Sequence, residues 1–150
     1  MALKEQVNND LKAALLGGDR FKGEVLRGLK ATILNEEVAS NKRDEGLDDV
    51  VVQQLVAREV KKRNESATIY DGAGRPELAD NERAEAKILM AYLPAQLSED
   101  EIAIVVARIV GELGVTGPSG LGQVIGAVKK ELGNSADGAT VARLVKNALQ

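Results

Sequence analysis

The stretch Leu121-Gly122-Gln123-Val124-Ile125-Gly126, followed by Ser135-Ala136-Asp137-Gly138-Ala139-Thr140-Val141, decides the fold of the C-terminal end of the chain. Apolar residues recur at helical spacing on both sides of a tight turn. Asp137 is placed to cap the second helix, because its side chain can accept a hydrogen bond from a free backbone N–H. The pattern predicts two short amphipathic helices. Their cations outnumber their acids: Lys129, Lys130, Arg143 and Lys146 against Glu131 and Asp137.

A third helix precedes these two. Ser98-Glu99-Asp100-Glu101 fits a capping box, and apolar residues at 3-4-3-4 spacing follow it. Before this helix, Leu93-Pro94 ends an earlier one, because proline moves its preceding residue out of the α region. We therefore expect a domain boundary near residues 93–97. The N-terminal helical domain is expected at residues 1–93 and a three-helix tail at residues 96–150.

The periodicity of the N-terminal part is also helical, so the sequence predicts an all-α protein with a multi-helix domain and a small C-terminal three-helix bundle. Breaks are expected at Gly17-Gly18, at the polar residues 40–46 and at residues 71–76. The second helix is expected to be capped by Asp19, and the third to open at Asp48 or Asp49. The side chains expected to point inward in this part are Leu3, Val7, Leu11, Leu15, Phe21, Val25, Leu26, Leu29, Ile33, Val38, Val52, Leu55, Val56, Val60, Leu78, Ala84, Ile88, Leu89 and Tyr92. Those expected in the tail are Ile102, Val105, Val106, Ile109, Val110, Leu113, Leu121, Val124, Ile125, Val128, Leu132, Val141, Leu144, Val145 and Leu149.

Composition excludes several classes of function. The 150 residues include no cysteine and no histidine, so thiol nucleophiles, histidine bases and histidine-bound zinc are excluded. No catalytic constellation, metal site or cofactor is expected. Aromatic residues make up 2% of the chain, too few for base-stacking platforms. The chain lacks a run long enough to span a membrane and begins with charged residues, so we expect a cytoplasmic protein without a membrane role.

Five short motifs in fixed order resemble the GatB/YqeY family of small bacterial proteins. That family is similar to the C-terminal part of the B subunit of glutamine-dependent aspartyl/glutamyl-tRNA amidotransferase. The resemblance covers essentially the whole chain. It rests on Leu26-Arg27-Gly28-Leu29-Lys30, Gly74-Arg75-Pro76-Glu77-Leu78-Ala79, Ile88-Leu89-Met90-Ala91-Tyr92-Leu93-Pro94-Ala95-Gln96-Leu97-Ser98, Leu121-Gly122-Gln123-Val124-Ile125 and Ala136-Asp137-Gly138.

The resemblance implies an all-helical protein with a larger N-terminal helical part and a three-helix tail. In the amidotransferase, the tail and the helical segment before it contact the outer body of the tRNA, while the kinase and amidase chemistry lies in other domains. The resemblance also implies a family-level label of carbon–nitrogen ligase with glutamine as amido-N-donor, and partners such as an aminoacyl-tRNA-related enzyme or complex. The RNA-binding candidates carried over are Gly122, Gln123, Lys129, Lys130, Asp137 and Gly138. Gln123 and Ser135 stand where the family often has lysine and arginine, and each departure removes a phosphate-binding charge.

Arg143 and Lys146 complete the candidate set, since cations on neighbouring helices can hold a phosphate backbone. The alternatives are structural. The cations can be an ordinary solvated face, Asp137-Gly138 a plain helix cap, and Gly122 with Gly126 a site of close helix packing. The basic run formed by Arg58 and residues 61–63 is read as a solvated helix end or a second RNA contact. At the level of function, the alternatives are a protein-interaction or scaffold domain and, third, a carboxylate hydrolase.

Overall fold

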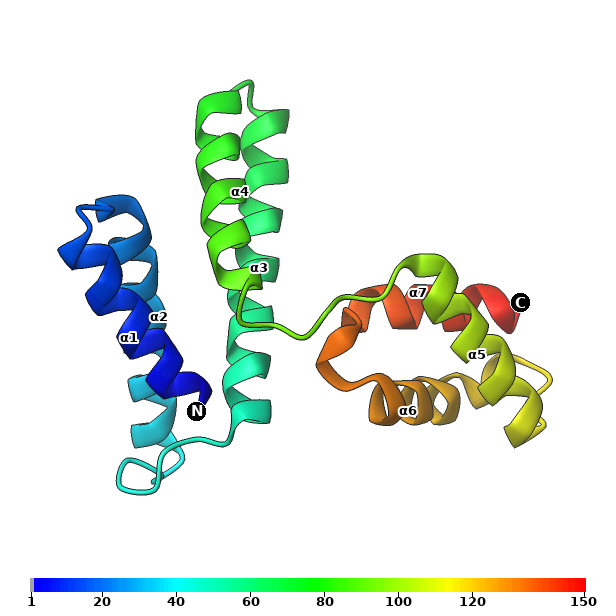
Figure 1. The fold of residues 1–150 in the computed structure, drawn as a ribbon. Coiled ribbons are helices and arrows are strands. Elements are labelled where there is room, and N and C mark those ends of the chain that lie inside the picture. The colour runs from blue at the N-terminus through cyan, green and yellow to red at the C-terminus, as the bar shows by residue number, and fades with distance from the viewer. Residues whose placement is uncertain (1) are drawn as a thin grey trace. The chain divides into compact units, whose positions relative to one another are not determined.

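The computed structural model describes residues 2–150 (Figure 1). Over this range it contains α-helices and short 3-10 turns and no strand, which confirms the all-α prediction. The chain divides into two compact units, one ending at Leu93 and the other comprising Pro94–Gln150. Each unit has its own apolar core and is described separately.

Two helical hairpins make the first unit (Figure 1). In the first hairpin, α1 (Leu3–Leu16) packs along α2 (Arg20–Ala39). In the second, α3 (Asp49–Gly72) packs along α4 (Pro76–Met90). The hairpins meet in one core, formed by Leu3, Val7, Leu11, Val25, Leu26, Leu29, Ile33, Val52, Leu55, Val56, Val60, Ala86, Leu89 and Tyr92.

Several residues expected inward are exposed instead. In α1 and α2, Leu15, Phe21 and Val38 are 49%, 39% and 59% exposed. Ala84 of α4 is also exposed, and Ala79 and Ala86 take the buried positions there. The cause is the choice between steps of three and four residues along each helix. One wrong step places the next expected residue beside the face that the neighbouring helix covers, and not on it.

Glu37 is the clearest case of this error. The buried stripe of α2 runs from Leu29 through Ile33 to Glu37, in steps of four, so Glu37 and not Val38 occupies the inward position. Its carboxylate is fully buried and both of its oxygens lie 2.8 Å from Nζ of Lys4 on α1. The loop between α2 and α3 closes over it at Gly46, which has a positive φ of 80° and whose missing Cβ would lie 3.6 Å from Oε2 of Glu37. The buried charge is therefore neutralised by one ammonium group.

The outer half of the α3–α4 hairpin forms an arm, residues 61–84, with almost no apolar core. Only Ala67 and Ala79 are buried in it. Two arginines tie the helices together across the arm: Arg63 donates to Glu85 at 3.2 Å and Arg83 pairs with Asp71. The arm is therefore held by close contact of small residues and by ion pairs.

Tyr92 ties the end of the first unit to its core. Its side chain is 4% exposed, and its hydroxyl donates a hydrogen bond to Oδ2 of Asp10 at 2.5 Å. Burial, together with the carboxylate that accepts this bond, raises the pKa of Tyr92 above the ordinary value of 10.0. The chain leaves the unit directly after this residue.

Replacing Tyr92 with phenylalanine should lower the free energy of unfolding by about 1–2 kcal/mol, because Asp10 loses the donor to its carboxylate. The folded protein holds the phenolic proton to a higher pH than the unfolded chain. The stabilisation is therefore complete below about pH 10 and is lost as the pH rises above it. Urea titrations of both proteins between neutral pH and pH 11 measure the difference between their free energies of unfolding. A difference that stays constant with pH would contradict the role of the phenol.

The second unit is a three-helix bundle of α5 (Glu99–Leu113), α6 (Leu121–Leu132) and α7 (Gly138–Ala148). Short 3-10 turns, η1 (Pro118–Gly120) and η2 (Gly133–Ser135), flank α6. Each helix packs against the other two. The core consists of Ile102, Val106, Ile109, Val124, Val128, Val141, Val145 and Leu149. Leu113, expected inward, is 40% exposed at the end of α5.

The expected helix caps form in the positions that the sequence indicates. Asp19 accepts a hydrogen bond from the Lys22 N–H at 3.1 Å, and Ser98 accepts one from the Glu101 N–H at 3.2 Å. α3 begins at Asp49, as expected, but the Asp48 side chain makes no capping hydrogen bond there. The carboxylate of Asp49 accepts the Leu3 N–H at 2.9 Å and so holds the start of α1 against the start of α3. Three helices therefore begin where their cap residues predict, counting Asp137, which caps α7.

The turn between α5 and α6 is tightly packed at Gly120. A Cβ at this position would lie 2.1 Å from Cγ1 of Val115 and 3.1 Å from its Cβ. Val115 is partly buried against the core of the second unit. No larger side chain fits at Gly120 unless the turn moves.

No single helix within residues 2–150 has the length and apolar character needed to cross a membrane. α5 and the segment Pro118–Ser135 pass that test only as a pair bent by 103°.

Candidate nucleic-acid interface

One face of α6 is open along its length. Gly122, Gln123 and Gly126 are exposed, and nothing lies within 4 Å of a Cβ built at either glycine. No helix of the second unit therefore packs closely against these two glycines. Gly122, Gly126 and Lys129 follow one another in steps of four and three, so they share this face. The result is bare backbone followed by a lysine.

The structure brings Lys129 and Gly138 together, although they belong to different helices. A Cβ at Gly138 would lie 3.4 Å from both Cε and Nζ of Lys129. Gly138 is the first residue of α7, where the helix dipole leaves partial positive charge. Asp137 caps this end by accepting the Thr140 N–H and the Thr140 hydroxyl, both at 3.0 Å. An ammonium group beside a helix amino end is an arrangement that attracts an anion such as phosphate.

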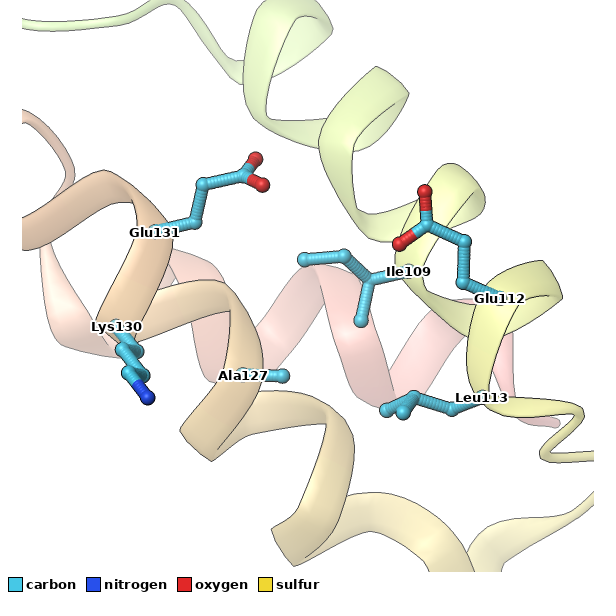
Figure 2. Close-up of a pocket in the computed structure, with 6 residues that line it drawn as sticks. All are labelled: Ile109, Glu112, Leu113, Ala127, Lys130 and Glu131. Atoms are coloured by element: carbon cyan, nitrogen blue, oxygen red, sulfur yellow. The ribbon is translucent and has the colours of Figure 1, made fainter.

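Lys130 lies at the rim of a shallow hollow between α5 and α6, of about 400 Å³. Figure 2 shows its ammonium turned away from the carboxylates of Glu112 and Glu131, which face one another across the gap. Arg108 joins those two carboxylates, donating to Glu112 at 3.0 Å and pairing with Glu131, and both acids raise the pKa of Arg108. The floor is apolar, formed by Ile109, Leu113 and Ala127. The acids of the hollow are thus occupied by Arg108, and Lys130 makes no ion pair within the described chain.

Arg143 and Lys146 differ in their surroundings. Arg143 pairs with Glu99 at the start of α5, and both side chains are at least half exposed. Lys146 has no ion pair among residues 2–150. α7 runs back along α6 in the opposite direction (Figure 1). Lys146 is eight residues after Gly138 in α7 and therefore lies about 12 Å from it along the helix axis. Among residues 2–150, Lys129, Lys130 and Lys146 thus make no ion pair, whereas Arg143 is neutralised by Glu99.

The basic run on α3 is partly neutralised as well. Arg63 pairs with Glu59 at 2.8 Å, as its spacing predicts, and Lys62 pairs with the same acid at 3.6 Å. Arg58 and Lys61 are exposed without an ion pair in the part of the chain that the structure describes. Arg58 and Lys61 are therefore accessible to a partner. Both interpretations of the run, as a solvated helix end and as a second RNA contact, stay predictions.

Sequence reasoning missed three contacts that shape these surfaces. They are the ion pairs of Glu37 with Lys4 and of Arg143 with Glu99, and the approach of Lys129 to Gly138. For Glu37 a signal existed, because it lies four residues after Ile33 on the buried stripe. Within the described residues, no group of three or more acidic side chains is placed to hold a metal ion.

Three yeast proteins named "Altered inheritance of mitochondria protein 41, mitochondrial" are similar to this chain. The protein of Kluyveromyces lactis is 32% identical over 125 residues, which cover 81% of this chain and 66% of the relative. That of Eremothecium gossypii is 35% identical over 59% of this chain and 48% of the relative. That of Lachancea thermotolerans is 30% identical over 75% and 60%. This chain spans about half to two thirds of the length of these relatives.

A family model described as "Yqey-like protein" matches residues 4–149, nearly the whole chain. The matched range contains all five motifs, which lie between residue 26 and residue 138. The chain belongs to the YqeY-like protein family.

Proposed function

We propose that this protein is a tRNA-associated accessory module, without a catalytic centre of its own, whose second unit binds the RNA phosphate backbone. The observation that carries the proposal is the position of Lys129, beside the amino end of α7 and at the end of the open face of α6. Lys130 and Lys146 add two further cations that make no ion pair with any described residue, and Gly122, Gln123 and Gly126 let a backbone approach closely. The carbon–nitrogen ligase chemistry is assigned to other domains of the amidotransferase, as the resemblance implies.

The proposal does not depend on the cellular compartment. The printed names of the yeast relatives describe them as mitochondrial. For this chain, the cytoplasm stays the prediction, and an aminoacyl-tRNA-related enzyme or complex stays the predicted protein partner. Both compartments contain tRNA, so the RNA contact is proposed for either one.

Total tRNA should bind the full chain in the micromolar range, and charge reversal at Lys129 and Lys130 should weaken binding by at least about tenfold at low salt. The slope of log affinity against log salt should also fall by roughly two, because each lost phosphate contact removes about one counterion. Fluorescence titration at several salt concentrations measures both quantities.

The matched control is charge reversal at Lys12 and Lys87, two exposed lysines of the first unit outside both basic surfaces, which changes the net charge equally. The proposal requires a much smaller effect there. Equal losses from both pairs would show a general effect of net charge, and no binding at low salt would contradict the RNA contact altogether. Binding of a protein partner that is insensitive to salt would favour the scaffold alternative.

Glu99→Gln should raise tRNA affinity two- to tenfold, because it releases Arg143 from its ion pair and adds one free cation beside the proposed contact. The pair is exposed, so its loss costs at most about 1 kcal/mol of stability. Glu101→Gln is the matched control, since Glu101 lies in the same helical turn and makes no ion pair with Arg143 in the part of the chain that the structure describes. Equal gains from both variants would show that the effect comes from net charge alone.

A further inference from the structure

A stripe of exposed side chains along the first hairpin has no partner within the described chain. It contains the aliphatic residues Leu15, Leu34 and Val38, which are 49%, 44% and 59% exposed, and between them the cations Arg27 and Lys30. We call these five residues the α2 stripe. Leu34 and Val38 are not part of the core, because Ile33 and Glu37 occupy the buried positions of the same helical turns.

Helical geometry makes this stripe continuous. Arg27, Lys30, Leu34 and Val38 follow one another in steps of three or four residues, so they lie on one face of α2. Leu15 of α1 joins the same face at Gly23, four residues before Arg27, where a Cβ would lie 3.1 Å from Cδ2 of Leu15. From Gly23 to Val38 the stripe is about 22 Å long, which matches four turns of a second helix.

The charge of the α2 stripe is uncompensated. Arg27 and Lys30 make no ion pair within residues 2–150. In the same unit, Arg63, Arg75 and Arg83 pair with acids, whereas Arg58 and Lys61 resemble Arg27 and Lys30 in making no ion pair with a described residue. The chain as a whole carries a net charge of −3, so a pair of free cations between aliphatic ends is a local feature and not a consequence of overall composition. The stripe therefore presents an apolar end at Leu15 of α1, a basic middle at Arg27 and Lys30 of α2, and a second apolar end at Leu34 and Val38.

We propose that the α2 stripe docks a helix of a partner protein whose contact face is apolar at both ends and acidic between them. Such a helix covers the three aliphatic side chains and places carboxylates against Arg27 and Lys30. This is helix-on-helix recognition with both apolar and charge complementarity. An RNA backbone satisfies the two cations but leaves the aliphatic residues in water, which is why a protein helix fits the stripe better.

The test uses a synthetic probe: an alanine-based helical peptide with one leucine near each end of a face and two glutamates between them. Titrated into the isotopically labelled full chain, it should shift the backbone amide signals of residues 23–38 and leave those of the second unit unchanged. Replacing both Leu34 and Val38 with serine should weaken it roughly tenfold. Replacing Arg27 and Lys30 with glutamate should weaken it too, and should restore binding to a matched peptide in which lysine replaces glutamate.

The matched control is Ile69→Ser, which removes a 70% exposed aliphatic side chain from α3, away from the stripe. It should leave peptide affinity unchanged. All of the substituted residues are exposed, so the thermal unfolding curves should superimpose and report on folding. Three results would overturn the proposal: no saturable shift at residues 23–38, equal weakening by Ile69→Ser, or tRNA binding that depends on Arg27 and Lys30 but not on Leu34 and Val38. The third result would make the stripe an RNA contact.

Discussion

Replacing Lys4 with methionine should lower the free energy of unfolding of the first unit by about 3 kcal/mol, because it leaves a buried carboxylate without its partner. Glu37 is fully buried, and the Lys4 ammonium is the group that donates to both of its oxygens. Methionine keeps most of the volume of the lysine stem. The loss therefore comes from the missing charge and not from a cavity. Urea denaturation of the full chain, with amide exchange at Leu29 and Ile33 as local probes, measures the effect.

Replacing Glu37, the other member of the ion pair, should lower the free energy of unfolding by less. In Glu37→Gln the remaining ammonium group belongs to Lys4, whose side chain is 37% exposed, so this charge can reach water. We therefore expect the free energy of unfolding to fall by about 1–2 kcal/mol. Combining Lys4→Met with Glu37→Leu should recover most of the lost stability, since an apolar pair of similar size replaces the ion pair. Equal costs for the two single changes would contradict the asymmetric burial of the pair.

Gly120→Ala should destabilise the second unit by about 2–3 kcal/mol. The added methyl group would overlap Val115, whose β-branched side chain has little freedom to turn away and is held against the core. The α5–α6 turn must therefore open. Amide exchange of α5 and α6 should accelerate while that of α1 to α4 stays unchanged, because the first unit has a separate core.

Gly126→Ala is the matched control for this prediction. It adds the same methyl group to the same unit, but into open space on an exposed helix. It should stabilise the unit by about 0.5–1 kcal/mol, since alanine is the better helix former. Destabilisation by both variants would show that the open face of α6 is covered by something in the folded protein.

The fold class and the helix starts were predictable because they depend on local chemistry. Asp19, Ser98 and Asp137 all cap helices by accepting the N–H three residues later, which is a short-range relation that a sequence displays directly. Most of the core followed from periodicity in the same way. Most errors arose at helix ends, as at Phe21 and Val38, where a single step of three or four decides which face is covered.

The candidate interface was predictable only in part. Composition and the family resemblance selected Lys129 and Gly138 separately, but only the fold of the η2 turn places them side by side. Neutralisation of Arg143 by Glu99 joins residues 44 positions apart, and that of Glu37 by Lys4 joins residues 33 apart. Such pairs depend on how helices align in three dimensions, and one-dimensional patterns carry no information on that alignment.

The outer arm of the α3–α4 hairpin is adjustable in length. Because only Ala67 and Ala79 are buried there, whole turns removed from both helices together would leave the core of the first unit intact. A deletion in one helix alone would shift Arg63 and Arg83 out of register with Glu85 and Asp71. Matched deletions would therefore move the tip of the arm toward the core in steps of about 5.4 Å per turn.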